Sequence, residues 1–403
     1  MDLIQDMQAL FSPETLPNPH IAYAKARAHG DLIPIAEWQT VMAFGLDEVN
    51  ALFKHPSVSS NRLGEAIESS FGAQLMRPMM LFHDHASHGR LRGLVAQAFT
   101  PTAVAQTKEI IAELCNELLD EHAQQGGDFL SNLAVPFPLR VIAKLLGLEQ
   151  IDQIAFRRWA DGLAILLDGQ PIEESRAQQI AQDLTQMQTY FRTSADELRA
   201  SKHPGVLGAM AQAEHEGQRL SSEELVSNAA LMVSAGFETT TNLIAGSMLA
   251  FSQFPEQQQL LLEQPELIPN ATEECLRFVS PVQMTQRIAR SRFEHNGLEI
   301  AAGSHINLML GAANRDPKRF TDPETFQVNR ANANKHLAFA SGPHYCLGAP
   351  LARLEMQVFL ECLLAKYPNF CVPEQPLEYR PNFAVRGLVR LEVQLEVEPE
   401  GQQ

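Results

Sequence analysis

The sequence contains no run of about 20 uninterrupted apolar residues, so it predicts no membrane-spanning helix. Positive charge is also scarce: 31 Lys and Arg residues stand against 48 Asp and Glu residues, a formal net charge of −17. This imbalance argues against nucleic acid, and against an anionic membrane surface, as the main partner. The N-terminal segment lacks the basic and apolar regions of a signal peptide, so we expect a cytoplasmic protein.

Cysteine is rare as well, and its spacing excludes several kinds of site. The chain has five cysteines, and no two of them form a C-x-x-C pair. An odd number in a protein expected to be cytoplasmic predicts free thiols and not a disulfide framework. For most of them, a role as a small buried apolar side chain is the simplest interpretation.

Apolar residues at helical spacing are abundant, because 45% of the 403 residues are apolar and many recur every three or four positions. The regions expected to be helical are residues 47–54, 102–127, 130–146, 152–167, 173–200, 221–255 and 347–367. The longest of them opens with the capping box Ser221-x-x-Glu224 and ends at Pro255. A helix of about 30 residues would be about 45 Å long and would cross a whole domain.

Strands are expected in fewer places. Two short strands should precede the helix at 47–54, Asn296-Gly297 should form a hairpin turn, and residues 385–398 alternate as a strand does. Residues 56–80 show no period and are predicted to be a long irregular loop. We therefore predict one domain over residues 1–403, mainly α with a minor β region (α+β).

The stretch SAGFETTTN, residues 234–242, lies in the middle of the long predicted helix. Gly236 costs up to about 1 kcal/mol there relative to alanine. The three threonines that follow are stiff at χ1, and their hydroxyls compete for backbone carbonyl groups. A purely structural helix gains nothing from this arrangement, although a kinked and inert helix is the simpler alternative.

The stretch FASGPHYCLGAPLARLE, residues 339–355, places Cys346 between two glycines and directly before a helix. A thiolate at this point is stabilised by the helix dipole and by free N–H groups. Gly342 and Gly348 would let the backbone fold closely around the sulfur, and His344 adds a cationic or hydrogen-bonding group. Zinc requires several clustered ligands, whereas one thiolate suits the axial position of haem iron.

At this point the chain resembles the cytochrome P-450 family of haem-thiolate monooxygenases, in particular its soluble bacterial members. The family motif Phe-x-x-Gly-x-x-x-Cys-x-Gly is matched by Phe339, Gly342, Cys346 and Gly348. The resemblance implies haem b (iron-protoporphyrin IX) as the cofactor, bound by this loop, with the Cys346 thiolate as its axial ligand. It covers nearly the whole chain and implies a long central helix over the haem.

Three further signatures follow the order expected for the family. Glu274-x-x-Arg277, together with Arg330, resembles the ion-paired folding core beside the haem, a structural role. An E-x-x-R pair alone has no value as a signature, because most such pairs lie on solvated helix faces. The residues expected to hold the haem propionates are His88, Arg92, Arg287 and His344.

The central helix matches the family signature Ala-Gly-x-(Asp/Glu)-Thr-Thr through Ala235, Gly236, Glu238 and Thr239. The resemblance implies that Gly236 brings the helix close to the haem. The Thr239 hydroxyl would bond the Ala235 carbonyl or release it, which opens the helix locally. Glu238 and Thr239 are the candidate catalytic residues, because Glu238 can relay protons and Thr239 can support the second protonation of dioxygen.

Three local departures from the family pattern concern loop shape. Ala340 replaces a glycine that usually precedes the haem loop, and Pro343 stiffens the loop. Asp84 to Ala86 replace the usual Asp-Pro-Pro before the helix that carries His88.

The substrate pocket should lie over the haem, between the central helix, residues 60–82 and 160–185, the segment after Pro281 and a C-terminal turn. Most candidates are apolar, so we expect a small apolar or aromatic substrate, with Gln283 as a possible polar contact. An aromatic residue at helical spacing is nevertheless more often core than pocket. The candidate pocket residues are Met232, Ala235, Phe237, Gln283, Met284, Phe383 and Ala384.

No flavin or nicotinamide domain fits beside the haem fold in 403 residues. The resemblance therefore implies electrons from a separate ferredoxin or flavodoxin with its reductase. Such partners are usually acidic, and so is this chain. We therefore expect docking at a local basic patch on the cysteine side, with Arg90, Arg353 and Lys335 as candidates.

Three functions stay open. The first is an O2-dependent monooxygenase acting by hydroxylation, epoxidation or dealkylation. The second is a haem-thiolate enzyme for peroxide-driven oxidation or for C–C or C–O coupling in natural-product synthesis. Glu238 and Thr239 argue against a dedicated peroxygenase, which would not need a proton relay. The third, a helical scaffold without cofactor, leaves Cys346, His344 and Gly236 unexplained.

Overall fold

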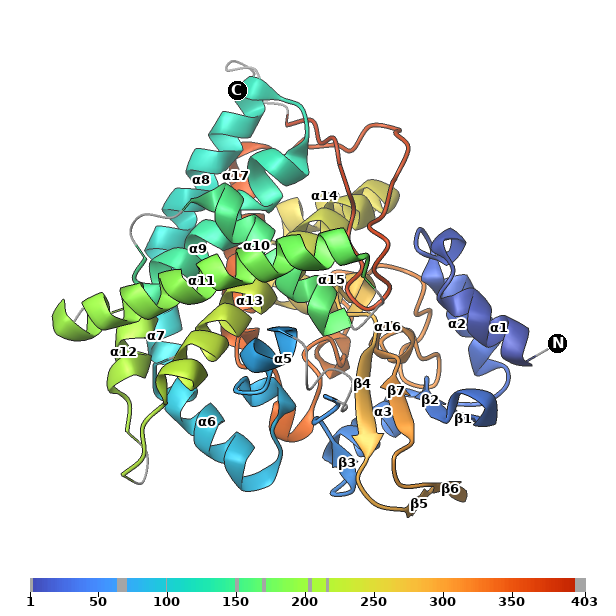
Figure 1. Cartoon of the computed structure of the whole chain (residues 1–403). Helices are drawn as coiled ribbons and strands as arrows, with labels where there is room; N and C mark the ends of the chain where they lie inside the picture. Colours follow the sequence, from blue (N-terminus) through green and yellow to red (C-terminus); the bar gives the residue numbers. More distant parts are fainter. Residues whose placement is uncertain are drawn as a thin grey trace. The chain divides into compact units, whose positions relative to one another are not determined.

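The computed structural model describes residues 3–63, 71–98, 100–148, 152–168, 172–201, 205–214 and 217–395. Most of these residues are helical, and the strands are few and short (Figure 1). The chain forms two compact units. The first comprises Met1–Ser59, Ile111–Val135 and Thr239–Gln403, and the second comprises Ser60–Ile110 and Pro136–Glu238. The helix-rich fold with a small β region confirms the predicted fold class.

The helices of the first unit are α1 (Leu3–Leu10), α2 (Pro19–Arg27), α3 (Leu46–Lys54), α14 (Pro255–Glu263), α15 (Ile268–Val279), α16 (Leu310–Ala313) and α17 (Ala349–Lys366). Those of the second are α5 (Phe71–Met76), α6 (His85–Ala98), α7 (Pro101–Ala105), α9 (Pro136–Leu146), α10 (Gln153–Asp168), α11 (Glu174–Ser201) and α12 (Val206–Gln212). Two helices, α8 (Lys108–Gln125) and α13 (Ser222–Gln253), begin in the second unit and end in the first.

The first unit contains a five-stranded sheet in the order β1-β2-β7-β4-β3. Its strands are β1 (Leu32–Ile35), β2 (Thr40–Ala43), β3 (Val58–Ser59), β4 (Thr285–Ala289) and β7 (His305–Leu308). The pairing of β2 with β7 is parallel, whereas the other pairs are antiparallel. Between β4 and β7, β5 (Phe293–His295) and β6 (Leu298–Ile300) form the predicted hairpin, with positive φ at Asn296 and Gly297.

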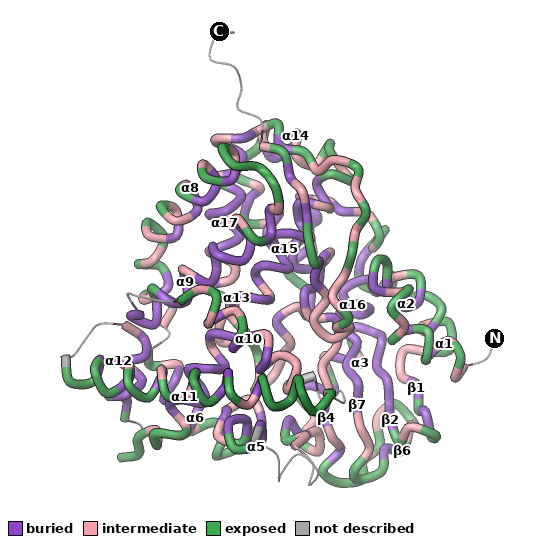
Figure 2. The backbone as a smooth tube through the Cα atoms, turned by 45° about the horizontal axis from the view of Figure 1, so that its top comes forward, coloured by how far each residue is buried: buried purple, intermediate pink, exposed green. Residues whose placement is uncertain are grey.

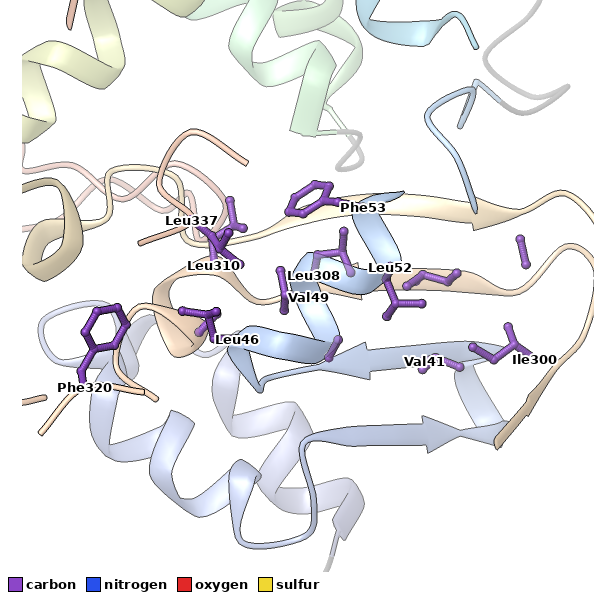
Figure 3. Close-up of a cluster of buried hydrophobic side chains, with 14 residues drawn as sticks. Val41, Leu46, Val49, Leu52, Phe53, Ile300, Leu308, Leu310, Phe320 and Leu337 are labelled. Carbon is purple, nitrogen blue, oxygen red and sulfur yellow. The ribbon is translucent and has the colours of Figure 1, made fainter. Parts of the chain in front are cut away.

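Helix α3 packs its apolar face against this sheet (Figure 3). Leu46, Val49, Leu52 and Phe53 recur at helical spacing and belong to the same buried cluster as strand residues such as Leu308. The last turn of α3 is thereby held in a fixed position on the sheet. This turn matters for the site, because the cysteine loop rests on it.

Helix α13 has 32 residues and is about 48 Å long. The capping box forms as predicted: the Ser221 amide donates to the Glu224 carboxylate (2.9 Å), and the Glu224 amide donates to the Ser221 hydroxyl (3.1 Å). The helix is mostly buried, whereas α11 exposes much of its length (Figure 2). It is α-helical throughout, so the local opening expected at Gly236 and Thr239 is absent from this described helix.

Three other predictions differ from the structure. Residues 385–395 form isolated bridges to several separate segments and no regular strand, because each bridging residue finds a different partner. The loop predicted at 56–80 contains β3 and α5, while residues 64–70 lie outside the described part of the chain. The predicted helix at 130–146 is a π-helical turn followed by α9, which begins at Pro136, where proline suits a first helical turn.

Among the described helices, none combines the length and the apolar character that crossing a membrane requires. The cytoplasmic location and the single domain over residues 1–403 stay predictions.

Candidate functional site

Cys346 is exposed and lies in a tight loop just before α17. The loop is closed by backbone hydrogen bonds from Cys346 N–H to the Phe339 carbonyl (3.0 Å) and from Tyr345 N–H to the Gly342 carbonyl (3.1 Å). Because α17 begins at Ala349, the sulfur lies near the positive end of an 18-residue helix. This placement favours a thiolate that can act as a ligand.

The loop needs glycine at one position for a clear steric reason. Gly342 has φ +71°, and a Cβ there would lie 2.9 Å from the carbonyl oxygen of Phe53 in α3. Gly348 has an ordinary φ of −78°, and a Cβ there would lie 3.8 Å from the Cys346 sulfur. Ala340 also has a positive φ, +59°, so the alanine found in place of the usual glycine adopts a backbone conformation that glycine prefers.

Arg353, near the start of α17, stabilises the cysteine loop through side-chain contacts. Its guanidinium donates to both carboxylate oxygens of Glu273 (2.6 and 3.0 Å) and to the Tyr345 hydroxyl (3.0 Å), and it lies 4.6 Å from the Phe339 ring centre. Burial opposes ionisation of Glu273, but hydrogen bonds from His336 and Arg353 lower its pKa to about 2. The cysteine loop is thus tied to α15 through a charged cluster.

Arg287, on β4, is buried, and both Arg287 and the cysteine loop contact Phe53 of α3. Its guanidinium lies 5.2 Å from the Phe53 ring centre and donates to the Thr285 hydroxyl (3.0 Å) and the Gln286 carbonyl (2.8 Å). Gly342 rests on the carbonyl of the same Phe53. The last turn of α3 therefore brings Arg287 and the loop carrying His344 and Cys346 to one place in the first unit.

Glu274, Arg277 and Arg330 form one buried ion-pair cluster in the first unit. Arg277 donates to both Glu274 oxygens (2.7 and 2.8 Å), and Arg330 Nε donates to the same carboxylate (3.0 and 3.1 Å). Both arginines also donate to the Thr325 carbonyl, so the cluster fastens the meander after α16 to α15. These contacts fit the structural role expected of the three residues.

The middle of α13 carries a partly exposed stripe on an otherwise buried helix. Ala235 is exposed, and Met232, Gly236 and Thr239 are partly exposed, which corresponds to the i, i+3, i+4, i+7 spacing of one face. Glu238, beside them, is only 7% exposed. Apart from Met232, this face holds small side chains.

The three threonines at 239–241 do not all have the same surroundings. The Thr241 hydroxyl donates to the Ala134 carbonyl (2.8 Å), and Thr240 hydrogen-bonds the carboxyl of Glu355 on α17. Both threonines are buried and anchor α13 within the first unit. Of the three threonines, only Thr239 lies on the partly exposed stripe.

His88 and Arg92 lie four residues apart on α6 and so share one helix face. His88 is buried, and burial, followed by the nearby charge of Arg92, lowers its pKa. The second unit thus presents two nitrogen donors from one helix.

Comparison with known proteins identifies the chain. The sequence model of the cytochrome P-450 family matches residues 165–398. The chain is 33% identical over 397 residues to the biotin-biosynthesis cytochrome P-450 of Bacillus subtilis, covering 96% of this chain and 98% of that protein. This chain belongs to the cytochrome P-450 family. It is also 33% identical to the monooxygenase PikC of Streptomyces venezuelae, with 93% and 91% of the two chains covered.

Solved P-450 structures agree. The chain matches the P-450 BioI, in complex with hexadec-9Z-enoic acid ligated acyl carrier protein, with a TM-score of 0.89, 33% identity, and 95% and 99% of the two chains covered. It matches the Bacillus subtilis polyketide-synthase P-450 PksS with a TM-score of 0.87, 31% identity, and 96% and 99% coverage. Members of the family bind haem through a cysteine thiolate.

The residues of this P-450 chain fit that cofactor. Cys346 offers an exposed thiol, and the described residues contain no group of three or more His, Cys, Asp and Glu side chains placed to hold a metal ion jointly. Arg287, buried beside the cysteine loop, supplies a cation that a buried carboxylate requires. The stripe at Ala235 supplies a face of small residues.

Several predicted pocket residues have other roles. Gln283 is fully buried, and its amide accepts from the Tyr23 hydroxyl (2.5 Å) and donates to the Val279 and Ser280 carbonyls (3.2 and 2.6 Å). A polar contact from Gln283 to substrate would compete with these bonds. Phe237 is 1% exposed and is a core residue.

The other pocket candidates lie at partly buried positions. Met284 and Phe383 pack against one apolar cluster that includes Tyr23, and Gln283 N–H donates to the Ala384 carbonyl (2.8 Å). The segment after Pro281 and the C-terminal turn therefore lie side by side, as expected of two walls. A cavity of about 490 Å³ in the first unit, between α2, α13 and residues 377–388, is lined by none of the candidates.

The predicted docking patch is weaker than expected. Arg90 forms an ion pair with Glu224, and Arg353 is paired with Glu273, so both charges are compensated. Of the three candidates, Lys335 is exposed. The sequence could not reveal these pairings, because each joins segments at least 80 residues apart.

Two ionisable residues with buried side-chain atoms lay outside the sequence-based selection. Glu355 is 1% exposed on α17, and burial raises its pKa to about 8. Arg62 follows β3 and has a buried Nη1 atom. For Arg62, the sequence offered only a positive charge in an irregular segment as a sign of a functional role. Glu355 has the sequence context of any glutamate on a helix surface, so nothing in the sequence marked it as buried.

Proposed function

We propose that this P-450 is a haem-thiolate monooxygenase that inserts one oxygen atom of O2 into a small, largely apolar organic substrate. The observation that carries the proposal is the exposed Cys346, held by the hydrogen-bonded loop ahead of α17. Its thiolate would be the axial ligand of haem b. Bound haem would supply the redox chemistry that activates O2 for hydroxylation, epoxidation or dealkylation.

The positive side chains would hold the propionates. Arg287 is buried and pre-positioned by Thr285 and Gln286, which lowers the entropy lost when a carboxylate binds. His88 and Arg92 share a face of α6, and His344 lies in the cysteine loop. The two arginines would neutralise two carboxylates that burial otherwise disfavours, and the two histidines would donate hydrogen bonds to them.

Glu238 and Thr239 would deliver protons. Glu238 is buried at the edge of the partly exposed stripe, and Thr239 lies on it, so a carboxyl and a hydroxyl are adjacent where a molecule can bind. The hydroxyl would donate a hydrogen bond to the oxygen that must be protonated, and the carboxyl would resupply its proton. This pair favours O2-dependent chemistry over peroxide-driven oxidation.

The Thr239→Ala variant tests this role. We expect normal haem content and normal O2 consumption, but about tenfold less product and a matching rise in hydrogen peroxide, because the second proton arrives too slowly. Thr241→Ala is the matched control, since Thr241 donates to Ala134 and should keep the wild-type ratio of product to peroxide. Unchanged coupling in Thr239→Ala would contradict the role.

Electrons would come from a separate ferredoxin or flavodoxin with its reductase. The first assay therefore combines the purified protein with such a pair, NADPH and 18O2, and follows 18O in the product. Hexadec-9Z-enoic acid, free and ligated to acyl carrier protein, is a suitable first substrate because the BioI structure contains it. Product formed with peroxide alone and not with O2, or a coupled product without 18O, would favour the alternative: peroxide-driven oxidation or oxidative coupling.

A further inference from the structure

Arg62 has a buried guanidinium nitrogen that lacks a hydrogen-bond partner. Its Nη1 atom is buried, and none of the described residues accepts from it. The other buried arginines of the described chain that carry unpaired nitrogens, Arg27 and Arg315, each donate through another nitrogen to a backbone carbonyl. Among the described residues, no hydrogen bond from another side-chain nitrogen of Arg62 compensates in this way, so Arg62 differs from the other two.

An unpaired guanidinium in this setting is costly. Burial lowers the pKa of Arg62 to about 10, which still leaves it charged at neutral pH. Among the described residues, its guanidinium contacts the Phe82 ring, whose centre lies 5.0 Å from the guanidinium carbon. A single cation–π contact offsets only part of the free-energy cost of burying an unpaired charged nitrogen. Arg62 is therefore placed as an arginine that binds an anion would be.

The backbone around Arg62 is fastened to the start of α6. Arg62 N–H donates to the Ser60 carbonyl (2.9 Å), and Ser60 N–H donates to the Asp84 carboxylate (3.0 Å). Asp84 directly precedes α6, whose first two turns carry His88 and Arg92. Within the second unit, the backbone of Arg62 is thus fastened near the end of the helix that carries the two expected propionate partners.

We infer that Arg62 binds a propionate carboxylate of haem by donating a hydrogen bond from Nη1. A guanidinium matches a carboxylate in geometry and keeps its charge when buried, so the pair removes the cost of two unpaired groups at once. The inference rests on the proposed function, because it requires bound haem. It adds a residue from the segment after β3 to the four already expected to hold the propionates.

The rate at which haem leaves the protein measures this contact directly. Haem loss from the purified holoprotein to excess apomyoglobin should be about tenfold faster, or more, in Arg62→Gln than in the wild type, because a charged hydrogen bond is lost. Arg62→Lys should lie between the two. Arg290→Gln, at an exposed arginine, is the matched control and should lose haem at the wild-type rate.

Haem dimethyl ester separates a propionate contact from a structural effect. The ester removes both carboxylate charges, so wild type and Arg62→Gln reconstituted with it should lose it at the same rate. An equal penalty for Arg62→Gln with haem and with the ester would overturn the inference, as would no penalty with either. Failure of the proposed function looks different: the wild type itself would then bind no thiolate-ligated haem.

Discussion

Glu355 should make the stability of this P-450 fall as pH rises. The residue is 1% exposed, and burial raises its pKa from the usual 4.5 to about 8, although a hydrogen bond from Thr240 partly opposes the shift. Its Oε1 atom is buried without a partner among the described residues. The carboxyl is therefore protonated at neutral pH in the folded protein and ionised in the unfolded chain.

The sign and size of the effect follow from proton linkage. Between pH 4.5 and 8 the folded state holds a proton that the unfolded state has released, so the free energy of unfolding falls by about 1.4 kcal/mol per pH unit. By pH 7 the accumulated loss is on the order of 3 kcal/mol. Glu355→Gln has the same shape and does not titrate, so it should lack this dependence.

The assay is urea unfolding of the holoprotein at pH 5, 6, 7 and 8, followed by circular dichroism. The free energy of unfolding of Glu355→Gln, relative to the wild type, should rise steadily over this range. Glu361→Gln, at an exposed position of the same helix, is the matched control and should show a constant difference. A constant difference for Glu355→Gln as well would refute the argument that Glu355 is buried in its neutral form.

Two further variants test the support of the cysteine loop. Ala340→Gly should raise the free energy of unfolding by up to about 1 kcal/mol in urea titrations, because glycine adopts the φ of +59° there without strain. A loss of stability would contradict the claim that the backbone at Ala340 is strained. Ala333→Gly, at a buried position nearby with an ordinary φ, should instead destabilise. Glu273→Gln should be less stable than wild type near neutral pH. The gap should shrink as pH falls from 4.5 towards 2, because over this range the unfolded chain takes up a proton before the folded protein does. A gap independent of pH in acid titrations would exclude this role.

The sequence predicted those parts of the protein whose geometry is set by neighbouring residues. The capping box at Ser221 and the hairpin turn at Asn296-Gly297 depend on residues only one to three positions apart, and both form as expected. The cysteine loop is similar, because Gly342 and the start of α17 are encoded within ten residues of Cys346.

Other features depend on partners that are distant in sequence. The amide of Gln283 is occupied by Tyr23, 260 residues away, and the charge of Arg353 is compensated by Glu273, 80 residues away. The C-terminal alternation predicts a strand, but the bridging residues there pair with separate segments. Glu355 and Arg62 acquire their properties from burial alone, which a single sequence does not display.

The absorption spectrum of the reduced protein under carbon monoxide tests the central claim most directly. Wild type and Cys371→Ala, which removes the other exposed cysteine, should both show the strongly red-shifted Soret band of thiolate-ligated haem. Cys346→Ala should lose that band. Haem absorbance without the shift in the wild type, or a shift that persists in Cys346→Ala, would contradict the assignment of Cys346 as the axial ligand.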